Sequence, residues 1–150
     1  MISTTPRPLK VEHAELHEEL AKATKEGGRV GEAAKAVAEL LHPHFVKEEE
    51  YALPPLGLLS MLAQGQVTPE MRDVLAMTDK LKAELPRMVE EHQAIVAALE
   101  KLVAAARQEG KPEYALFADK LMLHAQNEEE VLYPAAILVG EYLKLRSNTQ

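Results

Sequence analysis

The sequence of 150 residues contains no cysteine and no tryptophan, and only 4% of its residues are aromatic. Without cysteine, the chain can form neither disulfides nor the thiolate sites that hold structural zinc and iron–sulfur clusters. Apolar residues make up 47% of the chain and are mostly Ala, Leu, Val and Met, a balance that favours helices over strands. A chain of this length buries about two-thirds of its unfolded surface in one core. We therefore expect one helical domain.

Basic residues are also scarce, since 17 Lys and Arg face 24 Asp and Glu, for a net charge of −7. No basic stripe is present, so nucleic acid and anionic membranes are poor partners and cations are better ones. No stretch approaches the roughly 18 consecutive apolar residues of a membrane span, and the first residues, MISTTPRPLK, lack the apolar region of a signal peptide. We expect a cytoplasmic protein.

The spacing of apolar residues predicts four long helices, at about residues 9–26, 30–51, 68–109 and 112–132. Residues 1–8 read as a flexible lead-in, and residues 9–145 as one domain. Residues 56–67 should connect the two halves with one short helix. We expect Pro86 to kink the third helix, and Pro134 to break the fourth before a terminal segment at 135–145. The predicted fold class is all-α, an up-and-down antiparallel four-helix bundle with a short extra C-terminal helical segment.

Two segments of the chain repeat each other. HFVKEEEYALP begins at His44 and HAQNEEEVLYP begins at His124, so each has His-x-x-x-Glu, three consecutive Glu, and a proline ten residues after the histidine. A Glu-His pair lies upstream of each segment, with His13 standing 31 residues before His44 and His92 standing 32 residues before His124. Each half therefore has one plan: a helix carrying His, a turn, and a returning helix carrying His and Glu.

This spacing brings potential metal ligands together. Residues four apart share one face of a helix, so the imidazole and the carboxylate of His-x-x-x-Glu can approach the same metal pair. Two such halves bring six ligands to mid-bundle, where a pair of cations compensates the cost of burying charge. A lone histidine is more often an ordinary polar residue, but the repeat argues against that reading. His42 points to another face than His44 and is not expected to bind metal.

With this motif the sequence resembles the hemerythrin-like family, also called the HHE cation-binding domain, whose members repeat a histidine followed by His-x-x-x-Glu in a four-helix bundle. The resemblance covers residues 9–145. It implies a non-haem centre of two Fe ions with an oxo or hydroxo bridge, two bridging carboxylates and four terminal histidines. It assigns the bridges to Glu48 and Glu128, and the terminal ligands to His13, His44, His92 and His124. Such ligands also accept Zn or Mn.

Hemerythrins themselves add a fifth histidine one turn along the third helix. That position is Val96 here, but His17 follows His13 by one turn, at the corresponding place in the first half. We therefore predict His17 as a further metal ligand. In this hypothesis one metal is held by His13, His17 and His44, and the other is held by His92 and His124. The second metal would keep an open position for O₂, peroxide or a small anion.

Histidine-rich ligation favours O₂ binding over substrate oxidation, by ligand chemistry and family resemblance. We therefore expect a protein that binds or senses O₂ or a related small ligand. Two alternatives stay open: an enzyme that acts on peroxide or nitric oxide at the same centre, and a metal-free structural or interaction bundle. A sensor would need a protein partner, and the apolar residues 56–67 are a candidate docking segment.

Overall fold

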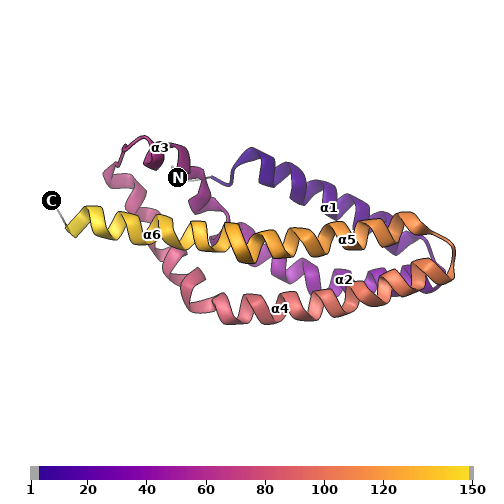
Figure 1. Ribbon diagram of the computed structural model, residues 1–150. Helices are drawn as coiled ribbons and strands as arrows, with labels where there is room; N and C mark the ends of the chain where they lie inside the picture. Colours follow the sequence, from indigo (N-terminus) through magenta and orange to yellow (C-terminus); the bar gives the residue numbers. More distant parts are fainter. Residues whose placement is uncertain (1–3, 149–150) are drawn as a thin grey trace.

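The computed structural model describes residues 4–148, and every regular element in that range is helical. The long elements are α1 (Arg7–Lys25), α2 (Gly28–Lys47), α4 (Leu75–Gln108), and α5 (Pro112–Asn127) with its continuation α6 (Tyr133–Asn148). They lie along one long axis, with the α1–α2 and α4–α5 connections at one end and α3 and the end of α6 at the other (Figure 1). Both α1 and α4 contact α2 and α5. The predicted helical bundle is thus confirmed.

The helix ends follow local sequence signals. α1 begins at Arg7, two residues before the predicted start, because Pro8 fits the first turn, where its missing N–H costs nothing. Residues 1–3 of the predicted lead-in lie outside the described residues. Gly27 and Gly28 adopt φ values of 78° and 58°, a left-handed conformation that turns the chain from α1 into α2. No helix among residues 4–148 is long and apolar enough to cross a membrane.

Each His-x-x-x-Glu motif ends in a π-helical turn that begins at its glutamate. These turns are η1 (Glu48–Ala52) and η4 (Glu128–Leu132). The Leu53 N–H donates to the Glu48 carbonyl at 2.9 Å, and the Tyr133 N–H donates to the Glu128 carbonyl. A proline follows at once in both copies, so the π turn lies where the next residue has no N–H to continue an α-helix. The repeat in the sequence is therefore also a repeat in the backbone.

The prediction that Pro134 breaks the fourth helix is wrong. The extra residue in η4 shifts the hydrogen bonds by one position, and the chain continues into α6, which has 16 residues rather than a short segment. The first repeat behaves differently, because after η1 the chain leaves the bundle. It forms the 3-10 helix η2 (Pro54–Leu58), the short α3 (Leu59–Ala63) and the 3-10 helix η3 (Pro69–Val74) before α4. Pro86 lies within α4, which continues for 34 residues.

The predicted ligands form a polar layer between two apolar clusters. The larger cluster lies toward the α1–α2 and α4–α5 connections and includes Leu16, Phe45 and Ile95. The second lies toward η2 and includes Met88 and Tyr133. Every ligand-bearing helix passes from one cluster to the other through this layer. Tight packing on both sides therefore holds the ligand side chains at one height in the bundle.

Candidate metal centre

Six of the seven predicted ligands meet in this buried layer. Each comes from the helix that the sequence predicted for it, in the order His13 from α1, His44 from α2 with Glu48 opening η1, His92 from α4, and His124 from α5 with Glu128 opening η4. Their exposed fractions run from 0% for Glu48 to 6% for His124. Histidine and glutamate are seldom buried so completely without a charged partner, which makes the layer a candidate functional site.

The ligand atoms form two groups, each small enough to surround one ion. Within each group the atoms lie no more than 4.8 Å apart; one group is His44, Glu48, His92 and Glu128, and the other is His13, His124 and Glu128. Glu128 belongs to both, with Oε1 at 3.1 Å from His92 Nε2 and Oε2 at 3.0 Å from His124 Nε2. Glu48 Oε1 also lies 3.8 Å from His13 Nε2. A carboxylate between two groups is placed to bridge two ions.

The structure pairs the histidines differently from the sequence hypothesis. His44 lies beside His92, with ring centroids 4.5 Å apart, and His13 lies beside His124, with centroids 5.1 Å apart. Each pair thus draws one histidine from each half of the repeat. The reason is the packing of the bundle, because α2 lies against α4 and α1 lies against α5. Spacing along the chain predicts which face of a helix a ligand occupies, but not which neighbour that face meets.

His17 belongs to neither group. Four residues along α1 place it about 6 Å farther toward the α1–α2 connection than His13. There it meets the edge of the Phe45 ring at a centroid distance of 4.7 Å, while Phe45 itself stacks on His13 at 4.3 Å. Burial lowers the pKa of His17 below its usual value. The five-histidine arrangement in which His13, His17 and His44 surround one metal is therefore not the arrangement in this structure.

Outer carboxylates hold three of the four buried histidines. Glu91 Oε1 accepts from His44 Nδ1 at 2.8 Å, and Glu129 Oε1 accepts from His92 Nδ1 at 3.1 Å. Glu12 Oε1 forms an ion pair with His124 Nδ1. A carboxylate on Nδ1 sets the imidazole tautomer and leaves Nε2 free to bind a cation. The sequence shows a glutamate directly before each upstream histidine. It does not show that this glutamate contacts a histidine on a different helix.

A tyrosine not included among the predicted ligands occupies the middle of one group. The Tyr133 side chain is fully buried, and its hydroxyl donates to Glu48 Oε2 at 2.6 Å. The same oxygen lies 3.2 Å from the Nε2 atoms of both His44 and His92. Burial, together with the charges of Glu48 and Glu128, raises the pKa of Tyr133 far above its usual value, so the phenol stays protonated. Tyr133 opens α6 and stands five residues after Glu128, so the sequence shows it near one ligand but does not show that its hydroxyl reaches ligands from other helices.

A protein-family comparison agrees with this geometry. The model of the hemerythrin HHE cation binding domain matches residues 4–136. The chain belongs to this family. No curated protein and no solved structure shows a significant match to it.

The buried atoms of this hemerythrin-family site fit a cation pair. Among the buried polar atoms without a hydrogen-bond partner are both ring nitrogens of His13 and Oε1 of Glu48. A buried acceptor without a partner costs about 1–3 kcal/mol, so neighbouring orphaned donor atoms of metal-binding type indicate a ligand. Imidazole and carboxylate suit iron, zinc and manganese alike.

The two carboxylates titrate as a pair. Burial, followed by the negative charge of Glu128, raises the pKa of Glu48 well above its usual value. Burial also acts to raise the pKa of Glu128, but hydrogen bonds from Glu48 and the surrounding histidines outweigh it and hold that pKa low. Burial acts to lower the pKa of His124, yet Glu128 and Glu12 raise it overall. Two buried carboxylates so close together do not both ionise readily, and a cation between them would offset that repulsion.

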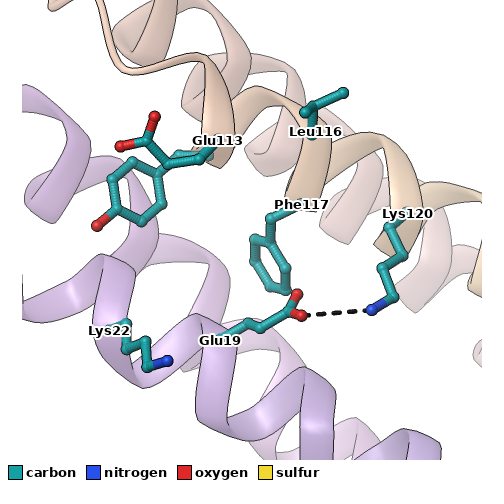
Figure 2. Close-up of a pocket in the computed structure, with 7 residues that line it drawn as sticks. Glu19, Lys22, Glu113, Leu116, Phe117 and Lys120 are labelled. Atoms are coloured by element: carbon teal, nitrogen blue, oxygen red, sulfur yellow. Dashed lines mark hydrogen bonds and ion pairs between the residues drawn. The ribbon is translucent and has the colours of Figure 1, made fainter.

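Another hollow in this hemerythrin domain lies away from the centre. It has a volume of about 360 Å³ between α1 and α5, where Phe117 forms the floor and Glu19 faces Lys120 at 3.3 Å (Figure 2). None of the six buried ligands lines it. It offers an exposed ion pair beside an apolar floor and none of the residues grouped as possible metal ligands.

Proposed function

We propose that this chain is an up-and-down antiparallel bundle that holds two Fe ions with an oxo or hydroxo bridge, and that binds or senses O₂ or a related small ligand. The observation that carries the proposal is the position of Glu128 between two buried groups of histidines. A bridging carboxylate is the feature that separates a metal pair from a single site. Family membership supports cation binding.

In this proposal six residues hold the metals: His13, His44, His92, His124, Glu48 and Glu128. The glutamates neutralise part of the positive charge, and the imidazoles bind through Nε2 because an outer carboxylate lies against Nδ1 in three of them. An iron pair, when bound, supplies the electrons with which O₂ or peroxide interacts. His17 lies beside the centre, and the proposal does not need it as a ligand. A cytoplasmic location and a protein partner for a sensor belong to the same proposal.

The test is aerobic purification with iron, followed by metal analysis and optical spectra before and after O₂, azide and peroxide. We expect about two irons per chain and a charge-transfer band that changes with azide or O₂. A protein that holds no metal under reducing, iron-replete conditions would instead be a structural bundle. Sustained release of O₂ from peroxide without loss of iron would make it an enzyme. Zinc or manganese in the purified protein does not identify the native metal, because these ligands accept both.

A further inference from the structure

The two ends of the centre differ at one repeat-related position. Leu53 and Tyr133 each stand nine residues after the histidine of their His-x-x-x-Glu motif. Tyr133 places a hydroxyl among the ligand atoms of His44 and His92, at 3.2 Å from each. Leu53 is buried but has no polar atom to offer at the corresponding end. The His44 end is therefore filled by a phenol, and the end formed by His13 and His124 is not.

A second difference falls at the same end. Glu129 covers Nδ1 of His92, and its counterpart one residue after the other motif glutamate is Glu49. Glu49 is exposed, and Nδ1 of His13 has no hydrogen-bond partner. His13 is nevertheless only 4% exposed. Both departures from the repeat thus leave the ring nitrogens of His13 without a hydrogen bond in the described chain, with Nε2 at 3.6 Å from Glu128 Oε2.

A groove reaches His13 from the surface. It has a volume of about 740 Å³ and is lined along its length by apolar side chains, among them Leu9, Ala14, Leu53 and Met77. Thr4 and Thr5 form part of its wall. Their segment crosses η2 at Gly57, where a Cβ would collide with the Thr4 carbonyl. The wall is therefore set by backbone contact, and the groove is a shaped feature rather than a gap between side chains.

The size and lining of this groove select a class of ligand. Small-molecule sites in proteins have about 300–1,000 Å³ and are mostly apolar, with a few polar groups that orient the ligand. Here the lining includes the imidazoles of His13 and His17, of which His13 belongs to the centre, and its acids Glu49 and Glu50 face the single Lys10. Two acids beside one base disfavour anions. A volume of this size also exceeds what O₂ or hydrogen peroxide would fill.

We propose that the His13 end is the open end of the centre, and that this groove binds a neutral, mostly apolar molecule with one polar terminus directed at His13. The proposal rests on the proposed function, because the polar terminus meets the metal held there. It replaces the expectation from the sequence, in which the open metal was the one held by His92 and His124. It also adds a ligand class larger than O₂, with an alkyl or aryl organic hydroperoxide as a natural example.

The test compares two metal-binding probes with one head group and different tails, acetohydroxamic acid and octanohydroxamic acid, by optical titration of the iron-loaded protein. If half of the six additional methylenes are buried at roughly 0.8 kcal/mol each, the longer probe binds about 50-fold tighter. Ala14→Phe fills the groove beside His13 and should reduce this advantage to less than about 5-fold. Gln93→Phe is the matched control, because Gln93 is the repeat counterpart of Ala14, follows His92 and is likewise exposed. It should keep the full advantage.

Leu53→Tyr tests the position of the open end independently of the probe's tail. It supplies the missing phenol at the His13 end and should lower the affinity for both probes. Equal affinity of the wild-type protein for the two probes would overturn the proposal that the groove binds the apolar tail. If Gln93→Phe removes the tighter binding of the longer probe and Ala14→Phe keeps it, the ligand binds at the His92 end instead. If the protein holds no iron, the proposed function fails, and NMR titration of the metal-free protein with octanohydroxamic acid still tests the groove. Shifts at Ala14, His17 and Met77 support it, and their absence overturns it.

Discussion

The Tyr133 hydroxyl can be removed with a single-atom change, Tyr133→Phe. The ring is fully buried, so phenylalanine keeps its packing while Glu48 loses the donor at 2.6 Å. The other carboxylate oxygen of Glu48 already has no hydrogen-bond partner. In the metal-free protein the substitution therefore removes the hydroxyl donor of Glu48 and leaves Glu128 and His44 among its remaining polar neighbours. The two histidine nitrogens at 3.2 Å lose the same neighbour.

The expected cost follows from these contacts. A buried polar group that loses its partner costs about 1–3 kcal/mol, and we expect about 2 kcal/mol here because the raised pKa of Glu48 lets a proton offset part of the loss. For a domain of this size that cost lowers Tm by roughly 4–8 °C. In the proposed centre, Glu48 and both histidines would hold the metal, which would satisfy them directly. In the metal-loaded protein the same substitution should therefore cost only about 1 kcal/mol.

Urea denaturation of metal-free and metal-loaded protein measures both values. Tyr142→Phe is the control, since its half-buried hydroxyl accepts from Arg146 near the surface, and it should change stability by less than about 0.5 kcal/mol in both forms. Equal effects of the two substitutions on the metal-free protein would refute the argument. So would a larger cost for Tyr133→Phe with metal than without, because the phenol would then support the metal-bound form instead.

Three further predictions address the ligands. Glu128→Gln should lower the iron content to one ion or fewer per chain by metal analysis, whereas Glu130→Gln, at an exposed position of the same turn, should keep both. Iron binding should release protons near pH 6.5, because the raised pKa of His124 keeps it protonated there in the metal-free protein. The affinity for iron should therefore fall about tenfold per pH unit as the pH decreases below the pKa of His124. Calorimetry of iron binding in buffers of different ionisation enthalpy measures the protons released. A heat of binding that does not depend on the buffer would contradict the predicted proton release. His17→Ala should leave the iron content unchanged and His13→Ala should reduce it, and loss of iron from His17→Ala would restore His17 as a ligand.

Some properties of this protein follow from the sequence alone. Helical periodicity, with Gly27, Gly28 and Gly110 between the periodic runs, predicted a helical bundle, which the structure confirms. The repeated His-x-x-x-Glu indicated the family, because residues four apart share a helix face regardless of what lies opposite. These are local properties. They depend only on the geometry of one helix, so no knowledge of neighbouring helices was needed.

Other properties depend on which helices are neighbours. The pairing of His13 with His124 follows from the contact between α1 and α5, and Phe45 meets His17 because α2 lies beside α1. Tyr133 and Leu53 occupy equal places in the repeat, yet only the packed bundle puts one against ligand atoms and the other against a groove. The sequence by itself determined which residues could bind metal. The tertiary structure decided how they are grouped and which end is open, because both depend on distances between helices that spacing along the chain does not contain.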